Sequence, residues 1–527
     1  RSDQPLVWST GRGTDVWALF CACAAGDLES ARQLLDRDPA LVRCHFAYRT
    51  PLYFAVRENR LPVVSLLLER GADPLSLAVN DTLVQIAIDR GHRQMESLLR
   101  SWLRDRCNAS PAGEPLARAI RDGDIPRILA RLDAAPELIH TGDERSNQPI
   151  HWAVMTRQPE VIDLLLARGA DINARRFDGA RPIHLTNGDY HFRGWRDVPP
   201  TAPASPDEVY RHLVERGAEV PLGMACAKGD LGRVRAIVNR DPAEANRVSD
   251  YGSYYVGCGA PLKNAAAAGQ LEIVELLLRC GADPNLPEEG IAPHGHALYA
   301  AVANGHREIA RLLLEHGAHP NPEVESSADA LSRAIDRGDQ AMIDLLCRHG
   351  AARGVHLLAY YNDLRTAAAV FAANPALAND AEALANAASE DFVRLLPRHA
   401  PRLPTRITVA KDNPTTELLF RHGMDPNRPD WLGGTPLHDL ARRGDVEAAR
   451  QFLDHGADPH ARDEDLLSSP LACAARFNRA LMVEFLLRRG ARLRLPDDPP
   501  WATPLAWARR RGHTEIAALL EQAARWG

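Results

Sequence analysis

Short stripes of apolar residues recur along the whole chain at helical spacing. Two clear examples run from Val63 to Leu68 and from Ile273 to Leu278. Apolar side chains repeated at intervals of three and four residues form the buried face of a helix. A short apolar segment with Pro near its start, such as Thr435-Pro436-Leu437, stands a few residues before many of these stripes. The pattern therefore predicts pairs of short helices rather than strands.

The polar residues between the stripes predict where the helices begin and end. A Thr at the start caps a helix whose first-turn Pro needs no hydrogen-bond acceptor. A Gly after the stripe ends the second helix in a left-handed conformation, and Asp or Asn next to it favours a turn. The string Gly-Ala-Asp stands in this place at residues 71–73, 169–171, 281–283 and 456–458. Each unit is thus expected to be a helix, a turn, a second helix and a projecting loop, which we call a finger.

This combination of motifs resembles the ankyrin repeat. The segment Gly434-Thr435-Pro436-Leu437-His438, followed by Ala441 and by Gly456-Ala457-Asp458-Pro459, is close to the family's full motif. At about 33 residues per unit, the 527 residues allow about sixteen units. The resemblance implies an all-α solenoid of helix-turn-helix units with elaborated fingers. The expected unit starts are Asp15, Thr50, Asp81, Glu114, Gln148, Arg181, Pro221, Ala260, His296, Ala328, Val355, Asp380, Ile407, Thr435, Pro470 and Thr503.

Two departures from the repeat divide the expected solenoid. The motifs run through residues 1–354, which we expect to form a front lobe. An insertion at 188–207, rich in Pro and aromatic residues, interrupts this lobe. Residues 355–413 have lost the Thr-Pro-Leu start and most of the Gly-Ala-Asp ending, so we expect degenerate repeats there. The motifs return in a rear lobe at 414–527.

Composition narrows the classes of partner. The chain has 63 Lys+Arg and 69 Asp+Glu, a formal net charge of −6, and 45% apolar residues. Because affinity for nucleic acid depends on cations that neutralise phosphates, this balance argues against a nucleic-acid partner. No apolar stretch is long enough to predict a membrane span. Only three basic residues are lysines (Lys228, Lys263 and Lys411), an arginine bias that a GC-rich coding sequence also produces.

The nine cysteines are scattered and form no CxxC motif. This usage indicates free thiols in a reducing compartment, so a cytoplasmic location is expected. The phosphate-loop, GxGxxG, HExxH and GxSxG motifs are absent from the sequence, so no common catalytic motif predicts an enzyme.

The most site-like region consists of three unusual fingers at 248–259, 287–296 and 320–327. Neighbouring units in such a stack lie about 10 Å apart, so consecutive fingers share one surface. The first finger of the three carries Asp250, Tyr251, Tyr254 and Tyr255. The other two carry Glu288, Glu289, His294, His296, Glu323 and Glu325. Tyr190 and Trp195, from the insertion just upstream, are expected to cover this surface and contribute to ligand binding.

Three functional interpretations of these fingers stay open, beside a purely structural one. The leading interpretation is a concave surface that binds a protein partner, with tyrosines as anchors. The second is a divalent metal site built on His294 and His296 with nearby glutamates, although no cofactor is required by the first interpretation. The third is a hydrolase-like pocket for a polar small molecule or glycan, in which Glu288, Glu289, Glu323 and Glu325 supply the acid and the base.

Other polar residues are expected to have structural roles. His151, His184 and His438 occupy the Pro-Leu-His position of the repeat, where the resemblance implies hydrogen bonds to the backbone of neighbouring units. The charged groups Asp143-Glu144-Arg145, Arg175-Arg176 and Asp463-Glu464-Asp465 are expected to be solvated finger tips. Tyr48, Tyr53, Trp152 and Trp431 lie near finger–helix junctions, and they either extend an aromatic lining or pack between units.

Overall fold

A computed structural model gives the fold of the chain. It describes residues 3–4, 6, 9–78, 81–188, 202–249, 256–286, 296–321, 329–379, 381–399, 413–421 and 423–526. The chain divides into two compact units, unit 1 at Arg1–Ala352 and unit 2 at Arg353–Gly527. Among the described residues, we find no helix with the length and apolarity needed to cross a bilayer.

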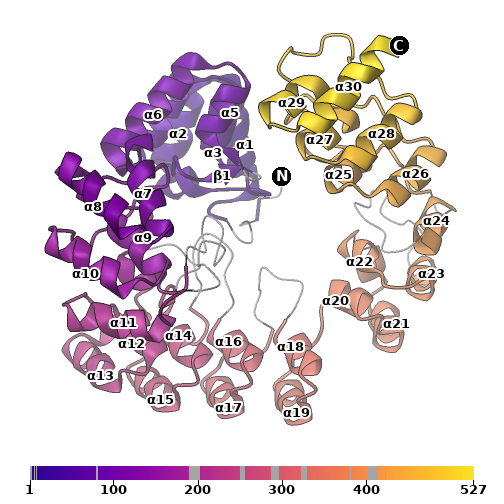
Figure 1. Ribbon diagram of the computed structural model, residues 1–527. Helices are drawn as coiled ribbons and strands as arrows, with labels where there is room; N and C mark the ends of the chain where they lie inside the picture. Colours follow the sequence, from indigo (N-terminus) through magenta and orange to yellow (C-terminus); the bar gives the residue numbers. More distant parts are fainter. Residues whose placement is uncertain are drawn as a thin grey trace. The chain divides into compact units, whose positions relative to one another are not determined.

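Pairs of short helices make up both units, as the sequence predicts (Figure 1). The first helices of unit 1 are α1 (Gly13–Ala25), α3 (Pro51–Arg57), α5 (Leu83–Asp89), α7 (Glu114–Arg121), α9 (Pro149–Met155), the 3-10 helix η4 (Pro182–Leu185), α12 (Leu222–Lys228), α14 (Pro261–Ala267), α16 (Ala297–Ala303) and α18 (Ala330–Asp336). Their second helices are α2 (Leu28–Arg37), α4 (Leu61–Glu69), α6 (Arg93–Cys107), α8 (Ile125–Ala134), α10 (Pro159–Ala167), α11 (Pro206–Glu215), α13 (Leu231–Arg240), α15 (Leu271–Arg279), α17 (Arg307–Glu315) and α19 (Gln340–Arg348).

Unit 2 repeats this order. Its first helices are α20 (Val355–Tyr360), α22 (Ala381–Asn386), α25 (Pro436–Arg443), α27 (Pro470–Arg476) and α29 (Pro504–Arg510). Its second helices are α21 (Leu364–Ala373), α23 (Glu390–His399), α24 (Asn413–Arg421), α26 (Val446–Asp454), α28 (Ala480–Arg488) and α30 (Thr514–Trp526). The described residues thus hold ten complete pairs in unit 1 and five in unit 2, with α24 following residues outside the description. These fifteen pairs together with α24 confirm the prediction of about sixteen units.

The helix boundaries follow from the motifs. The Thr50 side chain accepts a hydrogen bond from the backbone N–H of Tyr53 at 3.2 Å, which caps α3 just before Pro51. At the other end of a unit, the N–H of Ala282 donates to the carbonyl of Leu277 at 3.0 Å, and Gly281 has a φ of +83°. Such a left-handed residue ends a helix by turning its last carbonyls toward the chain that follows.

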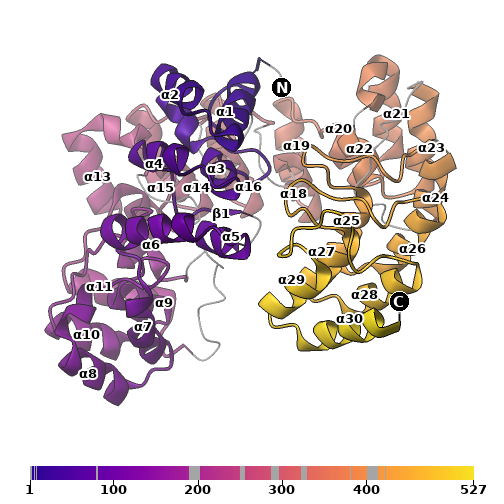
Figure 2. The same cartoon turned by 90° about the horizontal axis from the view of Figure 1, so that it is seen from above.

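Each pair buries its apolar stripe against its neighbours. In unit 1, α12 packs on α14 and α14 on α16, and these helices follow one another in chain order (Figure 1). In unit 2, α25 packs on α27 and α27 on α29 (Figure 2). One apolar core runs from Leu116 to Leu346, and a second from Leu358 to Leu520. Successive pairs therefore share a continuous interior, as in other repeat solenoids.

Asparagine side chains connect neighbouring fingers. The Asn246 amide donates to the carbonyl of Gly281 at 2.8 Å and accepts from the N–H of Asp283 at 2.7 Å. Asn285 makes the same two bonds to Gly317 and His319 in the next unit. Asn321 and Asn427 repeat the arrangement in units further along. This ladder satisfies backbone groups at the end of each second helix, which fixes where each finger begins.

The remaining short elements lie between the helices. Five further 3-10 helices are seen in the described residues: η1 (Pro39–Arg43), η2 (Pro111–Gly113), η3 (Pro136–His140), η6 (Pro242–Asn246) and η7 (Pro375–Asn379). Two strands of two residues, β1 (Leu77–Ala78) and β2 (Asp81–Thr82), pair antiparallel at the second finger. All nine cysteines are free thiols, six of them buried, which agrees with the predicted absence of a disulfide framework.

Candidate functional site

Most of the predicted site residues lie outside the described residues. This holds for Tyr190, Trp195, Asp250, Tyr251, Tyr254, Tyr255, Glu288, Glu289, His294, Glu323 and Glu325. His296 is described: it immediately precedes α16, its side chain is half-buried, and that side chain makes no capping hydrogen bond to the helix. The metal and acid–base interpretations therefore stay predictions. The structure does define the parts of the chain from which the three fingers leave.

The finger at 248–259 closes at its base. The N–H of Ser249 donates to the carbonyl of Gly259 at 3.3 Å, and the N–H of Gly259 donates to the Ser249 hydroxyl at 2.8 Å. Below this pair, the Asn264 side chain on α14 donates to the carbonyl of Cys258 at 2.6 Å. The two ends of the finger are thus bonded to each other and to the first helix that follows.

A row of polar side chains lies on the first helices that follow the three fingers. Lys263 on α14 and Tyr299 on α16 occupy the third position of their helices, and they are 8% and 9% exposed. Arg333, at the fourth position of α18, donates from Nε to the Tyr299 hydroxyl at 3.1 Å. The Nη1 atom of Arg333 lies 3.5 Å from a carboxylate oxygen of Asp336. We call Lys263, Tyr299 and Arg333 the polar row.

The polar row was not predicted from the sequence. Each of its residues looks like an ordinary helix position when read alone. The signal that could have identified it is the register: third- and fourth-position residues of consecutive first helices share one side of the stack. Lys263 and Tyr299 are largely buried, whereas Arg333 is half-buried, so its guanidinium is the group of the row that can reach a carboxylate or carbonyl of a ligand.

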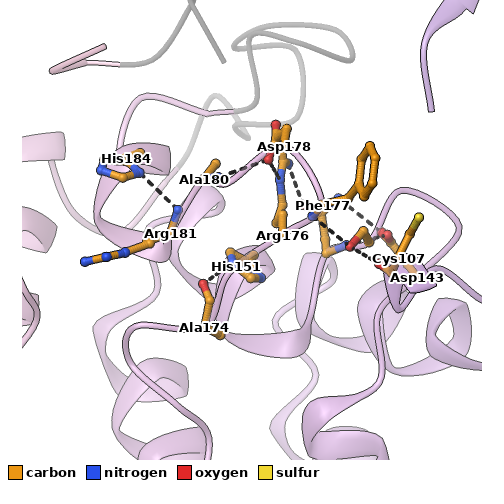
Figure 3. A network of polar contacts seen from close by, with 12 residues as sticks. Cys107, Asp143, His151, Ala174, Arg176, Phe177, Asp178, Ala180, Arg181 and His184 are labelled. Carbon is orange, nitrogen blue, oxygen red and sulfur yellow. Dashed lines mark hydrogen bonds and ion pairs between the residues drawn. The ribbon is translucent and has the colours of Figure 1, made fainter. Parts of the chain in front are cut away.

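A second polar cluster joins the finger before α9, which holds Asp143, to the finger after α10, which holds Arg176 (Figure 3). We call it the α9 network. The carboxylate of Asp143 accepts hydrogen bonds from the N–H groups of Arg145 and Asn147, at 2.8 and 2.9 Å, and from the indole of Trp152 at 2.7 Å. Asn147 in turn accepts from Arg176 at 2.7 Å. Arg176 also forms an ion pair with Asp178 in its own finger.

These contacts correct two predictions. Asp143 is 1% exposed and Arg176 is 4% exposed, so neither is a solvated finger tip. The reason is that Trp152 lies at the fourth position of α9 and reaches back to the preceding finger, which draws the carboxylate inward. Trp152 is itself fully buried, so it packs between units and does not line a free surface. Burial raises the pKa of Asp143, and the hydrogen bonds from Asn147, Trp152 and Arg145 partly oppose that rise.

The α9 network also connects the third helix pair to the fourth. The hydroxyl of Ser146 donates to the carbonyl of Cys107 at the end of α6, at 2.5 Å. The Asn108 amide donates to the carbonyl of His140 at 2.8 Å, and the N–H of Ser110 donates to the carbonyl of Asp143 at 3.0 Å. The apolar core that begins at Leu116 contains no side chain from the first three pairs. Hydrogen bonds from the finger before α9 therefore make up much of the contact between the third and fourth helix pairs.

Two of the three histidines at the Pro-Leu-His position, His151 and His438, make the predicted hydrogen bonds to the backbone of the next finger. His151 accepts at Nδ1 from the N–H of Gln148, and its Nε2 lies 3.1 Å from the carbonyl of Ala174 in the next finger. His438 makes the equivalent bonds to Thr435 and Ser468. His184 accepts from the N–H of Arg181 at 3.0 Å. Within the part of the chain that the structure describes, no three His, Cys, Asp or Glu side chains gather closely enough to hold a metal ion.

Unit 2 contains a related buried carboxylate. Asp463 is 7% exposed, so the prediction of a solvated tip is wrong here as well. Its carboxylate accepts from the N–H of Leu466 and lies 3.9 Å from the thiol of Cys473, which occupies the fourth position of α27 as Trp152 does on α9. Burial raises the pKa of Asp463 to about 7, and the nearby carboxylate of Asp465 adds to the rise.

This raised pKa gives unit 2 a specific pH dependence. The folded protein keeps a proton on Asp463 up to about pH 7, whereas the ordinary carboxyl loses it near 3.8. Folding therefore takes up a proton between these values, and the parent loses stability as the pH rises through them. We expect Asp463→Asn to gain stability relative to the parent by about 1.4 kcal/mol per pH unit in this window.

Urea unfolding of the parent and of Asp463→Asn at pH 5 and pH 8 measures this difference. Asp391→Asn, which neutralises an exposed carboxylate in the first turn of α23 in the same unit, is the control. A difference between Asp463→Asn and the parent that is the same at both pH values would show that this carboxyl has no raised pKa.

Comparisons with known proteins agree with the repeat architecture. A family model described as ankyrin repeats (3 copies) matches residues 9–78, 262–356 and 406–497. A second model, described as ankyrin repeat, matches residues 147–176. The matched ranges include the polar row, and Asn147, Trp152 and Arg176 of the α9 network.

Three relatives illustrate the range of similar proteins. The ARF GTPase-activating protein Git of Drosophila melanogaster is 42% identical over 84 residues, 16% of this chain and 11% of that protein. Human inversin is 24% identical over 221 residues, 40% of this chain and 20% of inversin. The bovine cyclin-dependent kinase 4 inhibitor B is 35% identical over 107 residues, 20% of this chain and 79% of the inhibitor. The chain thus spans a small part of the first two relatives and most of the third.

Proposed function

Because the chain belongs to the ankyrin-repeat family, we propose that it binds a protein partner through the fingers at 248–259, 287–296 and 320–327 and the first helices beneath them. The family match and the relatives support an interaction role for the repeats in general. The choice of these fingers rests on the composition of their loops and on the polar row.

The observation that carries this proposal is the polar row at the base of the fingers. Lys263, Tyr299 and Arg333 come from three consecutive first helices, and the hydrogen bond from Arg333 to Tyr299 fixes two of them relative to each other. Side chains already held in place lose little freedom when a partner binds, which favours affinity. Tyr and Arg are also the residue types that most often dominate the energy of a protein interface.

The bovine relative supports a protein as the partner class. Its name states that it inhibits a kinase, and the repeats similar to this chain make up 79% of its length. A protein that consists mostly of such repeats is thus named for its action on another protein. For the present chain we propose a protein partner without assigning it to the kinase class.

Substitution of the polar row tests this proposal. We expect the double variant Lys263→Met/Arg333→Met to keep its fold, because both replacements retain an apolar stem of similar length. We expect partner recovery with this variant to fall at least about tenfold, the consequence of losing about 1.4 kcal/mol or more of binding energy. The measurement is quantitative mass spectrometry of proteins that co-purify with the full chain from a lysate of the source organism.

A matched control comes from the same helix region. Arg337 follows α18 and is exposed, and its guanidinium donates to the carbonyl of Ala303. Arg337→Met removes the same charge a few residues away from the polar row, and we expect it to recover the partner as the parent does. Equal recovery of the same proteins by the double variant and the parent would refute a role for this surface.

A further inference from the structure

The helix pairs of unit 1 do not share one apolar interior throughout. The core from Leu116 to Leu346 contains, among the described residues, no side chain of the first three pairs, α1 to α6. The last turns of α6 bury Leu103 and Cys107 in a separate small cluster with Leu75. The apolar side chains before and after the finger at 108–113 therefore pack separately.

The first helices lose close packing at the same place. α3 packs on α5, and α7 packs on α9. In the described part of the chain, α5 and α7 do not make a contact of that extent, although they are consecutive first helices. The second helix between them is unusually long: α6 has 15 residues, whereas α4 has 9. Its six extra residues carry the chain about 9 Å further along the helix axis before α7 begins, which separates the two first helices.

The turn between the two helices of a pair also differs at this junction. In other pairs, the residue before the second helix donates to a carbonyl of the preceding first helix. Arg60 donates to a carbonyl of α1 at 2.9 Å, and Gln158 donates to a carbonyl of α7 at 2.7 Å. In the fourth pair this residue is Asp124, whose carboxylate instead caps its own helix α8 by accepting from the N–H of Arg127 at 3.0 Å. An ionised carboxylate has no proton to donate, so this side chain cannot connect the two pairs.

Hydrogen bonds on the finger side hold the junction. They join residues 107–110, at the end of the third pair, to residues 140–146, after α8. The shortest runs from the Ser146 hydroxyl to the carbonyl of Cys107 at 2.5 Å, and the Asn108 amide donates to the carbonyl of His140 at 2.8 Å. Attachment along one edge, without a shared apolar core, makes rotation about that edge the motion that disturbs the fewest contacts.

We propose that residues 108–113 form a hinge, about which the first three helix pairs, residues 13–107, turn as one body relative to the pairs that follow. The break in the core, the long α6 and the cap formed by Asp124 all fall at this one junction. The hinge lies within unit 1, and it does not depend on the binding role proposed for the fingers at 248–327.

Hydrogen exchange of the full chain tests whether the two sides are energetically separate. Leu116 at the start of α7 and Leu262 at the start of α14 are matched, because each follows a first-turn Pro and is 1% exposed. We expect Leu116→Ala to speed exchange in α9 at least about thirtyfold and to leave α1, α3 and α5 unchanged. We expect Leu262→Ala to speed exchange on both of its sides, in α12 and in α16, because the core is continuous there.

Two outcomes of this comparison would overturn the hinge. One is faster exchange of α3 and α5 in Leu116→Ala, as large as that of α9, which would show that the third and fourth pairs are coupled. The other is an effect of Leu262→Ala on one side only, because the junction at 108–113 would then differ in nothing from the rest. The milder Leu116→Val gives the same comparison if Leu116→Ala does not fold.

Distances between two spin labels test the motion itself. The exposed thiol of Cys21 on α1 and an Arg131→Cys thiol on α8 lie in the first and fourth pairs, on opposite sides of the hinge. The exposed thiol of Cys347 on α19 and an Arg235→Cys thiol on α13 also lie three pairs apart, in the tenth and seventh pairs, and do not span the hinge. In each protein, the unused exposed cysteine and the half-buried Cys280 are replaced by serine.

Double electron–electron resonance gives the distribution of each distance in the full chain. We expect a broader distribution for the labels on α1 and α8 than for the labels on α13 and α19. Equal widths for the two label pairs would overturn the hinge.

Discussion

Replacement of Trp152 by alanine is expected to destabilise the repeats around α9 by about 4 kcal/mol, within the range for large aromatic side chains in cores. Trp152 is fully buried, and its indole N–H donates to Asp143 at 2.7 Å. The guanidinium groups of Arg121 and Arg145 lie 4.5 and 5.3 Å from its ring centre. Trp152→Ala therefore leaves a cavity and also removes a donor from a buried carboxylate, which adds to the cost.

Amide hydrogen exchange measures this loss where it occurs. In a repeat protein each unit contacts only its neighbours, so a local defect need not unfold the distant units. We expect the amides of α7, α9 and α10 in Trp152→Ala to exchange about a thousandfold faster, and those of α27 and α29 to be unchanged. Trp152→Phe keeps most of the volume but not the N–H, and we expect a loss of about 1–3 kcal/mol. A Trp152→Phe protein as stable as the parent would show that the hydrogen bond to Asp143 contributes little.

Gly142→Ala is expected to have the second largest effect, about 3 kcal/mol or more, because it disturbs the backbone on both sides of the junction between the third and fourth helix pairs. A Cβ atom at position 142 would lie 1.9 Å from the carbonyl oxygen of Asn108 and 3.1 Å from the Cα of Ser146. Both are backbone atoms, so no side-chain rotation relieves the clash. The hydrogen bonds of Asn108 to His140 and Gly142 would have to break or lengthen.

Gly232→Ala is the matched control for this substitution. Gly232 lies on an exposed face of α13 in the same unit, and a Cβ there would meet only ordinary contact with Asp230 at 3.7 Å. We expect a gain of about 0.5–1 kcal/mol, since alanine favours a helix over glycine. Urea unfolding followed by circular dichroism compares the two variants. A Gly142→Ala protein as stable as Gly232→Ala would mean that the junction tolerates a wider spacing.

The helical framework follows from the sequence because its signals are local. Described first helices begin within two residues of the predicted unit starts, as α3 does after Thr50 and α18 after Ala328. A cap, a proline and an apolar stripe act within one or two turns, so neighbouring residues suffice to predict them. The structural roles of His151 and His438 were predictable for the same reason: the repeat motif fixes their position relative to the next finger.

The buried carboxylates were not predictable from local charge. Asp143 and Asp463 each stand in a run of charged residues, which in most loops is solvated. Their burial depends on the residue at the fourth position of the next first helix, Trp152 nine residues later and Cys473 ten residues later. The sequence feature that the two sites share is the position of the partner, the fourth residue of the next first helix. The polar row of Lys263, Tyr299 and Arg333 likewise requires the register of three consecutive units, which no single segment reveals.

The most direct test of partner binding by the fingers at 248–327 is hydrogen exchange of the full chain with and without the co-purified partner. We predict slower exchange in segments 248–259, 287–296 and 320–327 and at the starts of α14, α16 and α18 when the partner is bound. Protection confined to the second helices α13, α15, α17 and α19, with none in the three finger segments, would contradict the proposal.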